Sequence, residues 1–145
     1  MEKQDNLHKE LDLIQSVITR MANNSFLVKG WTMTLISALT AFGKDIVNGQ
    51  GAIYYLSAML LIIIPFWWLD AFFLKQERIF RKIYEKVISD PDATERVRYD
   101  LNPRGKAKEI GRVWKMMGAD VICWFYIPFS AFILIGILLK FLNII

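Results

Sequence analysis

The sequence predicts an all-α integral membrane protein: an N-terminal cytoplasmic amphipathic helix, three transmembrane helices, and a helical cytoplasmic loop between the second and third spans. Three observations support this prediction. Hydrophobic residues make up 54% of the 145 residues, which is more than soluble domains of this size normally carry. Three apolar segments are long enough to cross a bilayer at about 1.5 Å per residue. Finally, the positive charges gather on one side of these segments.

Residues 1–24 form the predicted cytoplasmic helix. Its apolar residues are spaced alternately four and three apart, which is a heptad seam: Leu7, Leu11, Ile14, Ile18 and Met21. Five seam positions are too few for an independent coiled coil, so we expect this helix to pack on another part of the protein or to self-associate. A helix lying on the bilayer is the alternative, although the polar face with Glu10, Asp12 and Arg20 carries few cations for that role.

Residues 25–43 are the first predicted span. Lys29 and several hydroxyl side chains interrupt its apolar sequence, so a protein with only the second and third spans is the alternative. Asn23, Asn24 and Ser25 are residue types that bond to nearby backbone, so we expect them to end the cytoplasmic helix and to cap the span. Small residues then recur every four positions, at Gly30, Thr34 and Ala38. This helix-packing ridge would let another helix approach closely in lipid, either the second span or another copy of the chain.

Residues 44–51 are the predicted external loop, and residues 52–74 the second span. Asp70 is the only charge in this second span. An ionisable group at mid-membrane costs on the order of 2.5–3.5 kcal/mol, so it usually has a partner or a function. Lys29 lies about one turn inside the first span, at the depth of Asp70.

We therefore predict an intramembrane charge pair between Lys29 and Asp70. Three interpretations stay open at this point. The pair is a permanent link between the spans, it is a switch that a signal opens, or the two groups are solvated separately, with Lys29 extending to the headgroups.

Residues 75–119 form the predicted basic cytoplasmic loop. An apolar stripe continues to about Ser89, so we expect one long helix to leave the membrane and to end at Asp90-Pro91. A loop over 91–105 follows, and then a second amphipathic helix from Lys106 that would lie at the inner membrane surface. This helix would carry four apolar residues on one face: Ile110, Val113, Trp114 and Met117.

A cationic group follows Asp70 by two to three turns, at Arg78, Arg81 and Lys82. Guanidinium groups bind phosphate oxygens in pairs, so these residues are candidates for contact with an anionic ligand or lipid. The alternative is that they form pairs within the helix, with Glu77 and Glu85.

Residues 120–145 contain the third span and an external C-terminus. Of the eighteen Lys and Arg residues, twelve lie between the second and third spans and three lie before the first, whereas the 44–51 loop holds only Lys44. The positive-inside rule therefore places the N-terminus and the 75–119 loop in the cytoplasm. The same rule places the short loop and the C-terminus outside.

Several function classes are not expected. His8 is the only histidine and has no nucleophile or second ligand at a useful spacing, so we predict no enzyme activity, metal site or cofactor. Cys123 is the only cysteine, which excludes an intrachain disulfide. The net charge of +4 is juxtamembrane, so the expected partner is a bilayer with anionic headgroups and not a nucleic acid.

Two motifs stand out in the sequence: RMANNSFLVKGW at 20–31 and FWWLDAFFLKQERIFRKIY at 66–84. In both motifs the chain resembles a family of small bacterial membrane proteins, in which they recur. The family is loosely similar to the SLATT-like membrane effectors of prokaryotic conflict systems. The matching residues include a span-entry motif and the exit from the second span: Asn24, Ser25, Lys29, Gly30, Trp31, Trp68, Asp70, Glu77, Arg78, Phe80, Arg81 and Tyr84. The third span departs from the plain two-span pattern of such effectors.

The resemblance implies a non-enzymatic, homo-oligomeric effector of the bacterial inner membrane in anti-phage defence. It would perturb or perforate the membrane when a soluble sensor, signalling partner or nucleotide signal reports infection. The alternatives are a membrane anchor or scaffold that recruits a soluble partner through the basic loop, and a minor transporter subunit.

Overall fold

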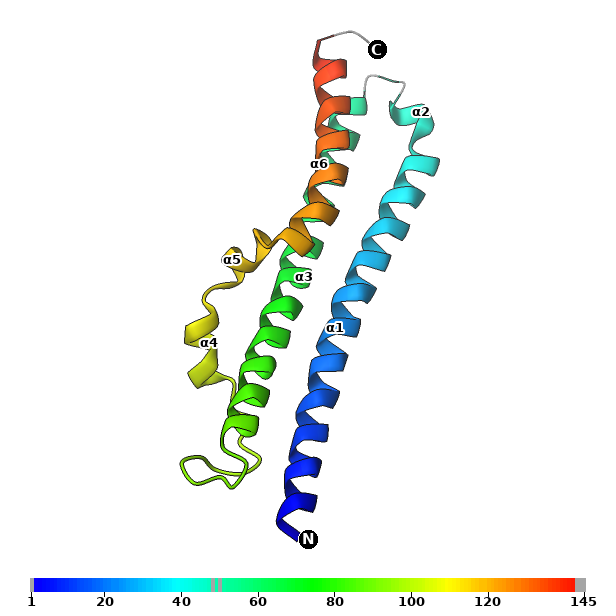
Figure 1. The fold of residues 1–145 in the computed structure, drawn as a ribbon. Helices are drawn as coiled ribbons and strands as arrows, with labels where there is room; N and C mark the ends of the chain where they lie inside the picture. The colour runs from blue at the N-terminus through cyan, green and yellow to red at the C-terminus, as the bar shows by residue number, and fades with distance from the viewer. Residues whose placement is uncertain (1, 48, 50, 143–145) are drawn as a thin grey trace.

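The computed structural model describes residues 2–47, 49 and 51–142, and within these residues all regular structure is helical. Two long helices, α1 (Glu2–Phe42) and α3 (Ala52–Ser89), lie side by side in opposite directions along most of their length (Figure 1). The third helix, α6 (Asp120–Phe141), packs on the first half of α3, which lies far from the N-terminus of the chain. Three short helices complete the described chain: α2 (Lys44–Val47), α4 (Arg104–Ile110) and α5 (Val113–Met117).

Three of these helices are long and apolar enough to cross a membrane: Gln4–Phe42, Ala52–Ser89 and Asp120–Phe141. The prediction of an all-helical chain with three helices of spanning length is therefore confirmed. The elongated structure has one half in which α1, α3 and α6 run together, and another in which α1 and α3 continue beside α4 and the preceding loop (Figure 1). We call these the span half and the soluble half, after the membrane-spanning and cytoplasmic segments that the sequence predicts there.

The expected break between the cytoplasmic helix and the first span is wrong. α1 continues through Asn23, Asn24 and Ser25 without interruption. Tertiary contacts account for this, because the Ser25 hydroxyl donates to the carboxylate of Asp70 on α3 and is not used to cap a helix. α1 thus extends from the soluble half into the span half as one continuous helix.

α3 is also continuous, from Ala52 through Pro65 to Ser89, as the unbroken apolar stripe indicated. In the soluble half, the seam of α1 packs against α3 around five buried residues: Ile14, Ile18, Ile79, Ile83 and Val87. The N-terminal helix therefore docks on this same chain, which was one of the outcomes expected for its heptad seam. Burial of this stripe away from water is the main favourable free-energy term for the association of these two helix segments.

The single amphipathic helix expected from Lys106 is instead two short helices. Gly111 has φ 91°, a left-handed conformation that ends α4, and Arg112 follows in extended conformation before α5 begins. The prediction that Trp114 shares one apolar face with its neighbours is therefore wrong, because Trp114 is 67% exposed. Ile110, Val113 and Met117 do pack against the hydrophobic core.

The 44–51 segment contains the short helix α2, where only a loop was expected. Beside it, the ring of Tyr55 lies against the backbone of Gly43, and the Tyr55 hydroxyl donates a 2.6 Å hydrogen bond to the carbonyl of Leu39. A side chain larger than hydrogen at position 43 would overlap this ring. The contact fixes the end of α1 against the beginning of α3.

Candidate functional site: a buried charge cluster

The candidate site is a polar cluster between α1 and α3, formed by Ser25, Lys29 and Asp70. The Lys29 ammonium lies 2.6 Å from Oδ2 of Asp70. The Ser25 hydroxyl donates a hydrogen bond to Oδ1 of the same carboxylate and accepts one of 3.0 Å from Lys29. Ser25 and Lys29 are one turn apart on α1, so both reach the same carboxylate. We call these three residues the charge cluster.

α6 closes the charge cluster from a third direction. Tyr126 is completely buried, and its hydroxyl faces both the Asp70 carboxylate and the hydroxyl of Thr32. The same hydroxyl donates a 3.3 Å hydrogen bond to the carbonyl of Phe66 on α3. The charge cluster thus lies where all three apolar helices meet.

The electrostatics of the charge cluster favour the paired arrangement of Lys29 and Asp70. The Asp70 side chain is fully buried and that of Lys29 is 19% exposed. A buried charge without a partner costs several kcal/mol, and the ion pair with added hydrogen bonds compensates this cost. The structure therefore brings the two predicted partners together, and the arrangement with two separately solvated groups is absent.

All five tryptophans lie near the level of the charge cluster. Trp31 follows Lys29 by two residues, Trp68 precedes Asp70 by two, and Trp124 precedes Tyr126 by two. Trp67 stacks on Tyr126, with ring centroids 5.6 Å apart, and its indole nitrogen donates a 3.0 Å hydrogen bond to the carbonyl of Met117 in α5. Trp114, in the same short helix, completes the group.

Four of these tryptophans point outward. Trp31, Trp68, Trp114 and Trp124 are 66%, 41%, 67% and 82% exposed. We call these four residues the tryptophan belt. They come from α1, α3, α5 and α6, so tertiary packing has brought exposed aromatic side chains from every major element to one level.

A second buried ion pair, in the soluble half, links α1 to the loop after α3. Arg96 forms two hydrogen bonds to the carboxylate of Glu10, of 2.6 and 2.9 Å, and the two side chains are only 5% and 2% exposed. The backbone N–H of Tyr99 also donates to Glu10, at 2.7 Å. Tyr99 adopts φ 59° in this arrangement, and its hydroxyl donates to the carbonyl of Asn6. We call Glu10, Arg96 and Tyr99 the loop contact.

Two carboxylates of the soluble half are held ionised. Burial raises the pKa of Glu10, but the hydrogen bonds from Arg96 and from the Tyr99 backbone, together with the charges of Arg96 and Arg98, outweigh it and leave the pKa below its usual value of 4.5. Backbone N–H groups of Thr94 and Glu95 lower the pKa of Asp90 from 3.8. Both carboxylates organise the loop, so the loop conformation depends on their ionisation.

The sequence interpretation missed the loop contact, because it assigned Glu10 to the polar face of the helix. That assignment is wrong: Glu10 is 1% exposed. The spacing contained a signal, since Glu10 lies three residues after Leu7 and four before Ile14, which places it on the seam face. No local signal identified Arg96 or Tyr126, whose partners lie 86 and 60 residues away along the chain.

The cationic group after Asp70 is occupied within this chain. Arg81 pairs with Glu77 at 2.6 Å, and Lys82 pairs with Glu85 at 2.9 Å. Arg78 donates to the sulfur of Met116 in α5 at 3.3 Å. The geometry therefore matches the alternative of pairs within the helix, while Arg78 connects α3 to α5.

The helix-packing ridge faces away from the rest of the chain. Gly30 and Thr34 are exposed, Ala38 is partly exposed, and a Cβ added at Gly30 would meet nothing within 4 Å. Of the span-entry residues, Ser25 reaches Asp70, whereas Asn24 is partly exposed and Trp31 joins the tryptophan belt. The ridge thus does not pack on the second span.

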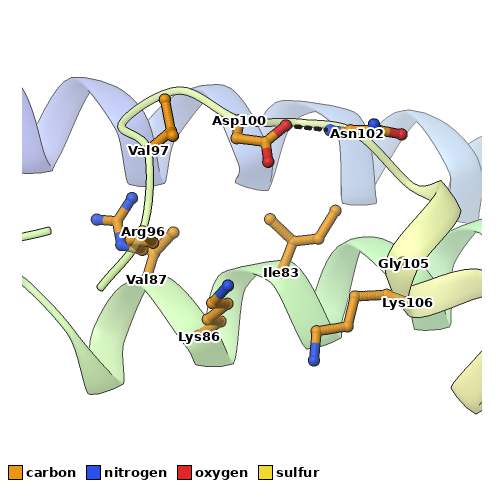
Figure 2. A pocket seen from close by; sticks show the side chains of 9 residues that line it. All are labelled: Ile83, Lys86, Val87, Arg96, Val97, Asp100, Asn102, Gly105 and Lys106. Carbon is orange, nitrogen blue, oxygen red and sulfur yellow. Dashed lines mark hydrogen bonds between the residues drawn. The ribbon is translucent and has the colours of Figure 1, made fainter. Parts of the chain in front are cut away.

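Two cavities lie outside the charge cluster. A cavity of about 250 Å³ in the soluble half is bordered by Lys86 of α3, Lys106 of α4 and Asp100 of the loop, with Ile83 between them (Figure 2). An apolar groove of about 730 Å³ lies between α1, α3 and α6 in the span half, with Lys140 at its edge. Within the described part of the chain, no three His, Cys, Asp or Glu side chains gather in a way that could hold a metal ion.

The charge cluster and the loop contact are therefore two buried ionic connections between distant parts of the described chain. A comparison with protein-family models, with curated proteins and with solved structures found no match to this chain.

Proposed function

We propose that this protein is a non-enzymatic, homo-oligomeric effector of the bacterial inner membrane, in which the soluble half senses a partner or signal and the span half then permeabilises the bilayer. The charge cluster holds the spans in the closed arrangement. The assignment to anti-phage defence rests on the resemblance to small bacterial membrane proteins and SLATT-like effectors.

The observation that supports signalling between the halves is the continuity of α1 and α3. Each helix runs from the soluble half into the span half without a break, over 41 and 38 residues. The loop contact binds α1 near one end, and the charge cluster binds it 15 to 19 residues further on. A partner that displaces the loop would therefore act on helices that extend directly to the charge cluster.

The tryptophan belt supports a specific membrane position. Tryptophan is enriched at membrane–water boundaries, where the indole ring contacts both hydrocarbon and headgroups. The exposed Phe42, Tyr54 and Phe141 occupy the opposite end of the span half. With the N-terminus in the cytoplasm, as the distribution of Lys and Arg favours, the charge cluster lies just inside the cytoplasmic boundary of the hydrocarbon.

The helix-packing ridge supports self-association. Small residues allow close packing of helices in lipid, and this ridge has no partner within the described part of the chain. In the proposed oligomer, a second copy of the protein packs against this ridge.

Expression from an inducible promoter in bacteria that carry a potential-sensitive dye tests the proposal. We expect depolarisation when the protein is produced under triggering conditions. The matched variants are Gly30→Leu and Met33→Leu, since both positions are exposed on α1. Gly30→Leu fills the ridge without a clash inside the protomer, so it should reduce both oligomerisation and depolarisation, whereas Met33→Leu should leave both intact.

An unchanged membrane potential under triggering conditions, with the protein inserted, would contradict the effector proposal. It would favour the second candidate, a membrane scaffold that recruits a soluble partner through its basic loop. The exposed surface of that loop supports this alternative, because Val97 is 75% exposed there despite the buried contact that Arg96 makes beside it.

A further inference from the structure

The residues around α5 form an exposed surface of cationic and aromatic side chains. Arg112, Trp114 and Lys115 are all exposed. Within the described residues, neither Arg112 nor Lys115 forms an ion pair, in contrast to Arg81 and Lys82 on α3. This surface therefore carries cationic charges beside α3 that no carboxylate of the described residues neutralises.

The packing of α5 explains why these side chains point outward. Met116 is 3% exposed, belongs to the hydrophobic core and accepts the contact from Arg78. The carbonyl of Met117 accepts the hydrogen bond from Trp67. These two methionines fix α5 against α3, so the other side of the short helix is exposed.

The position of α5 indicates what this surface meets. Trp114 belongs to the tryptophan belt, and the chain enters the apolar helix α6 at Asp120, three residues after α5 ends. Cations beside an interfacial tryptophan are attracted to the anionic lipids of the cytoplasmic leaflet. A guanidinium can also bind two phosphate oxygens at once.

We propose that Arg112, Trp114 and Lys115 form a binding site for the headgroup phosphate of an anionic phospholipid in the cytoplasmic leaflet. Arg112 and Lys115 bind the phosphate, and the indole of Trp114 lies at the boundary between headgroups and acyl chains. The site rests on the membrane position proposed above and does not depend on whether the protein permeabilises the membrane.

The first test compares two double variants of the purified full chain in nanodiscs that contain equal amounts of phosphatidylglycerol and phosphatidylcholine. Arg112→Gln with Lys115→Gln removes the proposed site. Arg81→Gln with Lys82→Gln removes the same charge from exposed side chains that are already paired within α3.

After exchange into neutral detergent, the lipid that each protein retains is measured by mass spectrometry. We expect several-fold less retained phosphatidylglycerol for the first variant and wild-type retention for the control. An equal loss in both variants would show attraction by net charge alone and would overturn the site, as would no loss in either.

Trp114 supplies a second measurement. In vesicles that contain brominated phosphatidylglycerol, the wild type should show more quenched tryptophan emission than Trp114→Phe, whereas brominated phosphatidylcholine should give a smaller difference. The same difference with both lipids would overturn the selectivity for anionic headgroups.

A failure of the membrane position is distinguishable from a failure of this site. If Trp31, Trp68 and Trp124 are also unquenched, the proposed membrane position fails together with the site. If these three are quenched and Trp114 is not, only the lipid site fails.

Discussion

The ammonium of Lys29 on α1 lies 2.6 Å from the buried carboxylate of Asp70 on α3. Ser25, one turn earlier on α1, donates to the same carboxylate, and Tyr126 of α6 faces it. One acid therefore connects the three apolar helices. Because the compensating groups come from two other helices, any movement of α1 or α6 relative to α3 exposes or unpairs this charge.

Removing one partner of the Lys29–Asp70 pair should destabilise the protein strongly. Lys29→Met leaves the Asp70 carboxylate buried without its counter-charge, which costs about 3–5 kcal/mol. Lys29→Met combined with Asp70→Asn removes both charges, so it should recover part of the loss. The midpoint of thermal unfolding in detergent, at one fixed scan rate, measures the effect.

Glu77→Gln provides the control for this pair, because it breaks the pair with Arg81, whose side chain is 62% exposed. We expect a change within about 1 kcal/mol there. If the charge cluster acts as a switch, Asp70→Asn should also alter the depolarisation of the bacteria, provided that the variant inserts into the membrane normally. Unchanged depolarisation would leave the pair as a structural link alone.

Glu10→Gln should release the loop that follows α3. The substitution leaves Arg96 buried without a counter-charge and weakens the bond to the Tyr99 backbone. Trypsin cleavage after Arg98 should then be at least tenfold faster, since cleavage follows the population of the open loop. Asp12→Asn, at an exposed position on the same helix, serves as the control and should cleave at the wild-type rate.

The loop should also open at acidic pH. The pKa values of Glu10 and Asp90 are lowered in the folded protein, so their stabilisation is complete above the usual values of 4.5 and 3.8 and is lost as the pH falls through the folded values. Hydrogen exchange of residues 90–103, corrected for the intrinsic pH dependence, should show constant protection from pH 7 to about 5 and a loss below pH 4. Glu10→Gln should remove most of this pH dependence, and a loss of protection near pH 6 would contradict the assignment.

Gly43→Ala should destabilise the junction between α1 and α3. The added methyl group overlaps the Tyr55 ring, which must move and give up its hydrogen bond to Leu39. We expect a loss of about 1–3 kcal/mol, measured as a lower thermal midpoint. Gly105→Ala is the matched control: a Cβ there meets nothing within 4 Å, and alanine favours the helix, so stability should stay equal or rise.

Much of the fold follows from local sequence patterns. The length and composition of the apolar segments predicted three helices of spanning length, because hydropathy and a rise of about 1.5 Å per residue act along each segment separately. The stripe from Ile79 to Val87 likewise indicated the continuation of α3. The pairing of Asp70 with Lys29 could also be predicted, because counting residues from the ends of their apolar segments gives both the same expected depth.

Other features depended on contacts between distant segments. Asn23, Asn24 and Ser25 have the chemistry of a helix start, but α1 continues through them because Ser25 bonds to Asp70. Glu10 has the chemistry of a surface residue, but it is buried because Arg96 and Tyr99 supply its hydrogen bonds. In both cases a partner from another element outweighed the local preference.

The residue pattern is enough to predict the helical class, the three apolar helices and the positions of the charges along them, since each depends on hydropathy and helical geometry within one segment. Packing between the helices accounts for the remaining features: α1 is unbroken, Tyr126 completes the environment of Asp70, Glu10 holds the loop and the ridge at Gly30 faces outward. These features depend on which faces of α1, α3 and α6 meet, and a buried charge is stable only where that packing supplies its partner.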